Sequence, residues 1–255
     1  GMAHPGALAA RVGSGVVELL VADLHALRAF DGVSGEARWI ERNVLGVSDL
    51  GSVLAVSVDG NDLLLSSFTD NNVRVWDTEA RRTRARIDNL QMPVSAIRYG
   101  GNILVAEYLA GHVKMIGSDL PRVIASGLQA PTDLLTDGDR LWVSDRTAGT
   151  VLQIGAGGER IEPVVLAANL EAPEGLALWR GRVLVREGES GRVYLLGGEV
   201  PELLVTLGAG SPPASDAQPP SMVLNDLVVV GDRLFAANEL ERTLVVVDLA
   251  GFVDG

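Results

Sequence analysis

The chain has 255 residues, of which 47% are hydrophobic and 21% charged, and its 33 acidic and 21 basic side chains give a formal net charge of −12. This apolar content excludes disorder as the main state, and the length suits a single domain spanning residues 1–255. The acidic balance excludes nucleic acid as the expected partner, because phosphate binding needs a basic face. No run approaches the roughly 20 apolar residues of a membrane-spanning helix. Without cysteine, disulfides and thiolate metal sites are also excluded.

The basic residues are strongly biased toward arginine. Lys114 is the only lysine among the 21 basic residues, and alanine, glycine and valine are abundant. This bias indicates a GC-rich bacterial source. We therefore expect a soluble protein of the bacterial cytoplasm or periplasm, and the sequence does not distinguish these two compartments.

A short apolar run, which usually ends at an acidic or amide residue, recurs along the chain. Its copies are Leu19–Asp23, Leu63–Ser67, Ile103–Glu107, Leu141–Asp145, Val183–Glu187 and Leu234–Asn238. Successive copies start 44, 40, 38, 42 and 51 residues apart. A nearly constant period of this length is typical of a repeat protein, in which each repeat is one supersecondary unit.

Each copy is followed by a turn and by a second run in which apolar and polar residues alternate, as in Asn72–Asp77 and Thr243–Asp248. Such alternation favours β-strands with one buried face. A strand-like stretch precedes each copy, and a weaker one, such as Arg82–Ile87, follows the second run. The unit is thus four antiparallel strands, and six units predict an all-β, six-bladed β-propeller.

Two segments depart from the repeat. After Asp248 only seven residues remain, so we expect either a three-stranded last blade or another form of ring closure. The stretch Gly6–Val12 could complete that blade, but it is also the expected inner strand of the first blade. The segment Gly208–Ser221 is rich in proline and serine and accounts for the 51-residue spacing. It is expected on the top face, either as a lid over the channel or as a tolerated surface insertion.

The inner strands of a propeller converge on one axis, so oxygen-bearing side chains at their starts are candidates for a shared site. Aligned on the downstream strands, these starts place Asp133, Glu174, Asn225 and Asp226 on one rim. Hard divalent cations take oxygen ligands, and carboxylates crowded in a channel are costly without a cation or a shared proton. The alternative is that these side chains cap turns between blades by binding backbone N–H groups.

Other polar and aromatic residues fit structural roles. A shared turn role is expected for the residues that end the short apolar runs, namely Asp23, Glu107, Asp145, Glu187 and Asn238. His25 and His112 are expected to be exposed and away from the axis, which disfavours histidine-based catalysis. Blade packing is the expected role of Trp76, Trp142 and Trp179. Arg98 and Arg186 interrupt apolar strands, and an inter-blade ion pair is their expected role. The alternative is that one of them neutralises the acidic rim or holds an anionic group.

The repeats Ala130–Ile154 and Ala172–Leu196 resemble the six-bladed propellers grouped around gluconolactonase and the senescence-marker lactonases, and also strictosidine-synthase-like proteins and NHL repeats. The resemblance implies a hydrolase of small lactones or esters whose divalent cation, calcium preferred over Mg²⁺, Mn²⁺ or Zn²⁺, polarises the carbonyl as a Lewis acid. Asp133, Asn225 and Asp226 occupy positions like those of the family's cation ligands, with Asp226 and Glu174 as candidate catalytic acids or bases.

The sequence departs from the lactonase pattern in two places. The first-blade glutamate ligand of that family has no counterpart near Gly6–Arg11, and Ser95 stands where another ligand is expected. The alternative is a non-catalytic propeller that binds a small ligand or a protein partner. A lyase of the streptogramin-inactivating type needs a histidine at the channel rim and is disfavoured.

Overall fold

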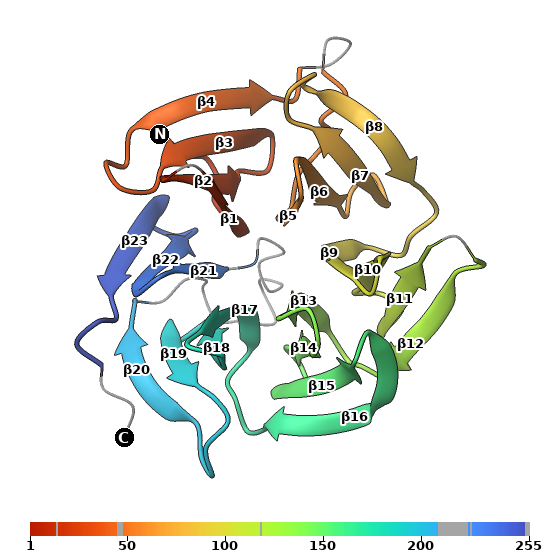
Figure 1. Cartoon of the computed structure of the whole chain (residues 1–255), viewed down its shortest axis with the longest axis vertical. Helices are drawn as coiled ribbons and strands as arrows, with labels where there is room; N and C mark the ends of the chain where they lie inside the picture. The colour runs from red at the N-terminus through yellow and green to blue at the C-terminus, as the bar shows by residue number, and fades with distance from the viewer. Residues whose placement is uncertain (14, 45–47, 118, 209–223, 225, 253–255) are drawn as a thin grey trace, which may run out of the picture.

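The computed structural model describes residues 1–13, 15–44, 48–117, 119–208, 224 and 226–252. In these ranges the chain forms 23 β-strands and no helix, arranged as six sheets around a central axis (Figure 1). Five sheets have four antiparallel strands and the sixth has three, which confirms the predicted six-bladed β-propeller. All of the predicted proline-rich segment Gly208–Ser221 except Gly208 lies outside the described residues, as does Asn225. No described helix could span a membrane.

Each blade runs outward from the axis in chain order. The inner strands are β1 (Leu8–Gly13), β5 (Ala55–Asp59), β9 (Pro93–Tyr99), β13 (Pro131–Thr136), β17 (Pro173–Trp179) and β21 (Leu227–Val230). The second strands are β2 (Val16–Ala22), β6 (Asp62–Ser67), β10 (Asn102–Glu107), β14 (Leu141–Asp145), β18 (Arg182–Glu187) and β22 (Arg233–Asn238).

The third strands are β3 (Ala26–Asp31), β7 (Asn72–Asp77), β11 (His112–Ile116), β15 (Thr150–Ala156), β19 (Arg192–Leu195) and β23 (Thr243–Asp248). The outer strands are β4 (Ala37–Arg42), β8 (Arg82–Ile87), β12 (Arg122–Ser126), β16 (Glu159–Ala167) and β20 (Glu202–Thr206).

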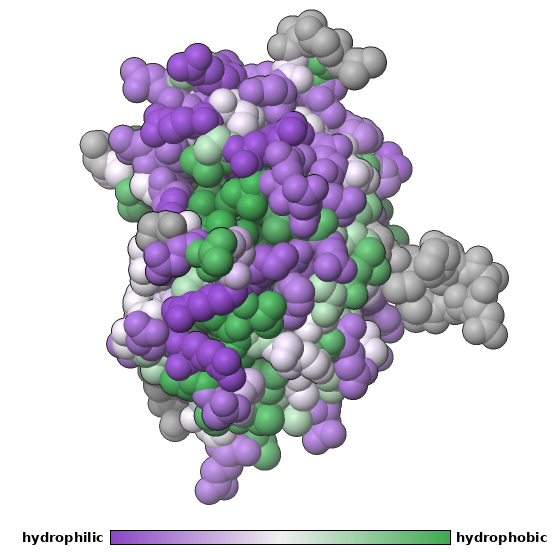
Figure 2. Space-filling view, turned by 90° about the vertical axis from the view of Figure 1, so that its right-hand side faces the viewer, coloured by the Kyte–Doolittle hydropathy of each residue, from purple (hydrophilic) through white to green (hydrophobic). Residues whose placement is uncertain are grey.

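The recurring apolar runs form the second strands because these strands have a neighbouring blade on both faces. In β6, β10 and β22 every residue after the first is buried. A strand covered on both sides has no solvent face and therefore reads as a continuous apolar run. Outer strands such as β8 are mostly exposed and contain no buried residue. Hydrophilic residues accordingly cover most of the rim on the side of β8, β11 and β12, with hydrophobic side chains between them (Figure 2).

Tryptophans pack the blades against one another, as predicted. Trp76 joins the core between blades 1 and 2, Trp142 that between blades 4 and 5, and Trp179 that between blades 5 and 6. Each of the three is at most 2% exposed. They are therefore part of the core that fixes one blade on the next and are not available to a ligand.

The residues that end the apolar runs fix the loops that lead into the blades. Asp145 accepts hydrogen bonds from the backbone N–H groups of Gln129 and Ala130, both at 2.8 Å, just before β13. Asp23, Glu107 and Glu187 bind backbone N–H groups before the inner strands of their own blades in the same way, and Asn238 binds the backbone N–H of Glu241. The expected turn role is confirmed for all five residues.

Within the described part of the chain, the ring closes without an exchanged strand. Most of the predicted stretch Gly6–Val12 lies in β1, the inner strand of blade 1, and no described residue supplies a fourth strand to blade 6. The backbone N–H of Leu8 donates to Oδ2 of Asp226 at 2.9 Å, and Leu8 packs with Phe235 of blade 6. Blades 6 and 1 are thus held together by non-covalent contacts alone.

Candidate binding site in the central channel

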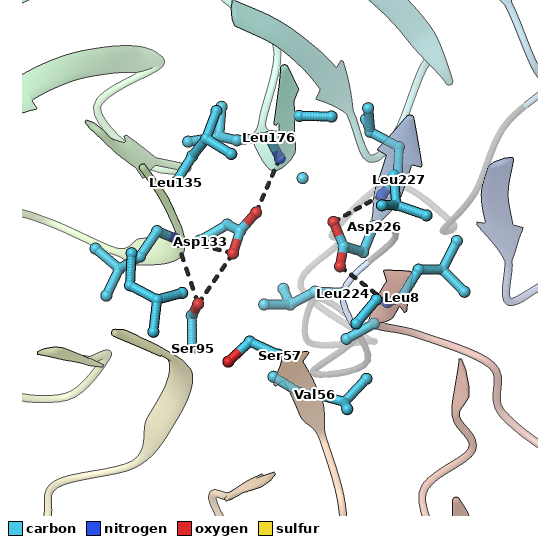
Figure 3. Close-up of a pocket in the computed structure, with 18 of the residues that line it drawn as sticks. Leu8, Val56, Ser57, Ser95, Asp133, Leu135, Leu176, Leu224, Asp226 and Leu227 are labelled. Atoms are coloured by element: carbon cyan, nitrogen blue, oxygen red, sulfur yellow. Dashed lines mark hydrogen bonds between the residues drawn. The ribbon is translucent and has the colours of Figure 1, made fainter. Parts of the chain in front are cut away.

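The six inner strands and the residues that lead into them enclose a cavity of about 370 Å³ on the axis of the ring. Most side chains that line it are leucine, valine, alanine and isoleucine. Eight of the lining residues are polar or charged, namely Ser57, Ser95, Arg98, Thr132, Asp133, Thr136, Glu174 and Asp226. The close-up labels Ser57, Ser95, Asp133 and Asp226 among them (Figure 3). The channel is therefore an aliphatic cavity with a small number of convergent polar groups, as ligand sites commonly are.

Strand pairing places the two aspartates at one level of the channel. Asp133 lies opposite Ser144 one residue before the end of β14, and Ser95 and Ala55 lie opposite the corresponding residues of β10 and β6. The backbone oxygen of Asp226 binds the N–H of Ala237, again one residue before the end of the second strand. The predicted convergence of Asp133 and Asp226 is thus observed, and their carboxyl groups project into the channel (Figure 3).

Asp133 binds donors from three blades. Its Oδ1 accepts hydrogen bonds from the Ser95 hydroxyl at 3.0 Å and from the backbone N–H of Leu134 at 2.8 Å. Its Oδ2 accepts one from the backbone N–H of Leu176 at 2.9 Å. Burial nevertheless dominates and raises the pKa of Asp133 to about 6.

Asp226 repeats this arrangement at the junction of blades 6 and 1. Its two carboxylate oxygens accept hydrogen bonds from the backbone N–H groups of Leu8, at 2.9 Å, and Leu227, at 2.7 Å. Burial first, and then the negative charge of Asp133, raise the pKa of Asp226 well above its usual range, while Arg186 opposes the shift. Asp133 and Asp226 therefore bind backbone N–H groups between blades, which is the alternative role predicted for them. They also face the channel.

Arg186 is a buried cation behind Asp226. It has no exposed surface, and its Nη1 donates to the backbone oxygen of Ala237 and lies 3.5 Å from that of Asp226. Its Nε and Nη2 have no hydrogen-bond partner among the described residues. Burial lowers the pKa of Arg186 to about 10, against the opposing charges of Glu174 and Asp226. Arg186 thus partly neutralises the rim, whereas Arg98 forms an inter-blade ion pair with Asp59.

Glu174 is placed differently from the two aspartates. Its carboxylate has no exposed surface, and Oε1 lies 3.1 Å from Nε of Arg146. A side chain at Gly188 would collide with it, because a Cβ there would lie 2.1 Å from Cδ of Glu174. The carboxylate of Glu174 is therefore enclosed by protein, although the residue is among those that line the cavity.

The described residues supply only part of the donor set that a divalent cation needs. They contain no group of three or more histidine, cysteine, aspartate or glutamate residues that could hold a metal ion. Ca²⁺ takes six to eight oxygen ligands, and only the Asp133 and Asp226 carboxylates face the cavity here. Asn225, the third predicted ligand, lies outside the described residues. We derive no catalytic step through a metal.

None of the three histidines lines the cavity. His25 is exposed, as expected. His112 was expected to be exposed too, and this is wrong: its side chain is 16% exposed, and its Nε2 lies 2.6 Å from Oε2 of Glu107. The reason is that Glu107 at the end of β10 lies directly opposite His112 at the start of β11. This pairing holds His112 in blade 3, away from the axis.

Comparisons with known proteins support the fold alone. No protein-family model matches the sequence, and no curated protein matches it significantly. Among solved structures, a streptogramin B lyase is similar with a TM-score of 0.65 at 13% identity, covering 97% of this chain and 84% of the other. Catalytically inactive virginiamycin B lyase from Staphylococcus aureus, determined with quinupristin, gives 0.61 at 11% identity, covering 98% and 85%.

The hydrazine synthase of Kuenenia stuttgartiensis is also similar, with a TM-score of 0.63 at 14% identity, covering 98% of this chain and 96% of the other. A lyase and a synthase thus share this architecture with the chain. Because one fold hosts many reactions, function has to be argued from the site itself. By fold the chain is a six-bladed β-propeller, and its site is an acidic pair in an aliphatic channel.

Proposed function

We propose that the protein binds a small organic amine in its central channel, with the ammonium group between Asp133 and Asp226. The observation that carries the proposal is that both carboxyl groups face one aliphatic cavity while burial raises the pKa of each. Ionised carboxylates in such surroundings are costly without a cation. A bound ammonium ion would offset that cost at both residues together.

The donor and acceptor groups favour an ammonium ion over a metal ion. An ammonium group has three N–H donors and needs only three acceptors, which the two aspartates and a serine hydroxyl of the channel wall can supply. No aromatic side chain is among the described residues that line the cavity, so the cation–π contacts that recognise quaternary ammonium ions are not provided. A primary amine with a short aliphatic or alicyclic body fits a cavity of about 370 Å³.

Calorimetric titration of the protein with cyclohexylamine at pH 8 tests the proposal. We expect saturable binding that Asp133→Asn and Asp226→Asn each weaken by about tenfold or more, since each removes a charge-assisted hydrogen bond. The matched control is Glu162→Gln, which removes a carboxylate whose side chain is 89% exposed on β16 and leaves the affinity unchanged. Affinity should also rise with pH through about 6, as Asp133 loses its proton.

Cyclohexanol has nearly the same shape as cyclohexylamine but no charge. It therefore distinguishes recognition of the ammonium charge from simple filling of the apolar cavity. We expect it to bind at least tenfold more weakly than cyclohexylamine. Equal binding of the alcohol and the amine, or an affinity for the amine that neither aspartate variant changes, would contradict the proposal.

A second candidate is a hydrolase of small lactones or esters, in which Asp133, Asn225 and Asp226 hold a divalent cation. The placement of two carboxyl groups at one level of the channel favours it, together with the resemblance of the repeats to the lactonases. When bound, the cation would polarise the substrate carbonyl. Calorimetry with Ca²⁺, Mn²⁺ and Zn²⁺ tests it, using the wild type, Asp133→Ala and Asp226→Ala, followed by a panel of lactones and aryl esters. A wild type that binds none of these ions excludes this candidate.

A further inference from the structure

One level of the channel receives one residue from each blade, and the two aspartates belong to it. Pairing with the second strands places Ala7, Ala55, Ser95, Asp133, Gly175 and Asp226 at this aspartate level. A strand rises about 3.3 Å per residue, so positions before and after the aspartate level lie progressively closer to one end of the cavity or the other.

On the side of the strand starts, the wall of the channel is buried. One position before the aspartate level, the described residues are Gly6, Leu54, Val94, Thr132 and Glu174, and all of them are buried. Asn225, which has this position in blade 6, lies outside the described residues. The described wall thus has no solvent-exposed residue at this level.

Leu224 crosses the axis on the same side. It leads into blade 6, whose neighbours are blades 5 and 1, yet it packs in the apolar cluster of blades 2, 3 and 4 that includes Leu54 and Val94 (Figure 1). Its side chain lines the cavity and is drawn near the centre of the ring in the close-up, and the residue is only 8% exposed (Figure 3). Leu224 therefore lies between the starts of the inner strands and separates the aspartates from that end of the channel.

On the opposite side, the wall is accessible to solvent. Three positions after the aspartate level the cavity is lined by Ala10, Val58, Arg98, Thr136, Leu178 and Val229, and none of these residues is buried. Arg98, the one charged residue among them, is paired with Asp59 of blade 2. The cavity thus opens where the inner strands end, and most of the side chains around this open end are uncharged.

The path between the aspartates and the open end is aliphatic. Leucine, valine, alanine and isoleucine line it, with Ser57 as the exception, and the Ser57 hydroxyl donates to the backbone oxygen of Ala96 at 2.5 Å. Three residues of strand correspond to about 10 Å, so an ammonium group at the aspartate level lies about this far from the open end. A chain of methylene groups on this path would lose its water contacts along its whole length.

We propose that the channel admits its ligand at the ends of the inner strands, and that this ligand is a primary amine whose unbranched alkyl chain points toward that opening. The inference rests on the proposed function, because Asp133 and Asp226 hold the ammonium group. It adds the route of entry, the orientation of the ligand and the length of its chain. Leu224 and the buried strand starts direct the chain away from their side.

The dependence of affinity on chain length tests the orientation. In calorimetric titrations at pH 8 with n-butylamine, n-hexylamine and n-octylamine, we expect the affinity to rise by about tenfold for each two methylene groups added, since each of them becomes buried. n-Dodecylamine should gain little over n-octylamine, because its last carbons extend beyond the open end into water. Equal affinities for n-butylamine and n-octylamine would overturn the proposed orientation.

A reversible block identifies the open end. The chain contains no cysteine, so Val229→Cys and Met92→Cys each carry a single thiol. Val229 lines the open end, whereas Met92 directly precedes β9 at the opposite end and is also partly exposed. Modification with benzyl methanethiosulfonate should weaken n-octylamine binding to Val229→Cys by at least tenfold, and dithiothreitol should restore it, which shows that the modified protein stays folded. Met92→Cys is the matched control, and its modification should leave the affinity unchanged.

The outcomes separate this inference from the proposed function. An unmodified protein that binds neither cyclohexylamine nor n-octylamine overturns both. If the unmodified protein binds these amines, the route of entry alone is overturned by a loss of affinity in modified Met92→Cys, or by full affinity in modified Val229→Cys.

Discussion

Asp133 connects three blades through one carboxyl group. Ser95 donates to it from blade 3, Leu134 from its own blade and Leu176 from blade 5. Three donors would normally hold a carboxylate in its charged form, yet the pKa of Asp133 rises to about 6 because burial outweighs them. Asp133 therefore connects these blades in both its protonated and its ionised form, and the balance between the two forms depends on pH.

The folding stability should depend on pH through this residue. The unfolded carboxyl titrates near 3.8 and the folded one near 6, so between these values the folded state binds more protons and the free energy of unfolding falls as pH rises. The contribution of Asp133 amounts to about 3 kcal/mol. Denaturation of the wild type and of Asp133→Asn at pH 4 and pH 8 measures it. We expect the free energy of unfolding of the wild type, relative to that of Asp133→Asn, to decrease from pH 4 to pH 8. A difference between the two proteins that does not change with pH would contradict the raised pKa of Asp133.

Asp145 shows how an element is fixed by a single side chain. It is 2% exposed, and its two oxygens accept the backbone N–H groups of Gln129, Ala130 and Ala148. These bonds hold the loop that leads into β13 against the end of β14. The equivalent contact recurs in blades 1, 3 and 5, so the inner strands of these four blades are positioned by acidic residues at the ends of the second strands.

Replacing Asp145 should therefore lower the free energy of unfolding more than an average substitution of a buried residue does. Asp145→Ala leaves buried N–H groups without an acceptor, and we expect a loss of about 3 kcal/mol in the free energy of unfolding. Urea denaturation measures it, with Glu162→Gln as a surface control that stays within about 0.5 kcal/mol of the wild type. A loss in Asp145→Ala as small as that of the control would show that water satisfies these groups.

The repeat and its strands could be predicted because the pattern is local. The run Leu141–Asp145 coincides with β14, and the spacing from the second strands placed Asp133 and Asp226 at one level. Glu174 was expected on the same rim, but its carboxylate is enclosed by protein. The expectation did not take into account that successive residues of a strand point to opposite sides. The contacts of Arg186 were not predictable, since its partner carbonyls lie 40 and 51 residues away in blade 6.

The ring as a whole has one junction that differs from the others. At five junctions the chain itself passes from one blade to the next, whereas blades 6 and 1 are joined only by non-covalent contacts. These include the bond from Leu8 to Asp226, a bond from Arg233 Nη1 to the backbone oxygen of Gly32 at 2.9 Å, and the packing of Phe235. Blade 6 also has the smallest sheet among the six. Local opening should therefore begin at this junction.

Native-state hydrogen exchange should reveal this order of opening. We expect the amides of β21 to β23 to exchange through openings that cost about 2 kcal/mol less than those of β13 to β15. Arg233→Ala removes the bond to Gly32 and should widen this difference, because nothing covalent restrains the junction. Arg98→Ala removes a comparable contact, the inter-blade ion pair with Asp59, where the chain connects blades 2 and 3. It should lower overall stability without selecting blade 6, and uniform protection in all six blades would instead mean that the ring unfolds as one cooperative unit.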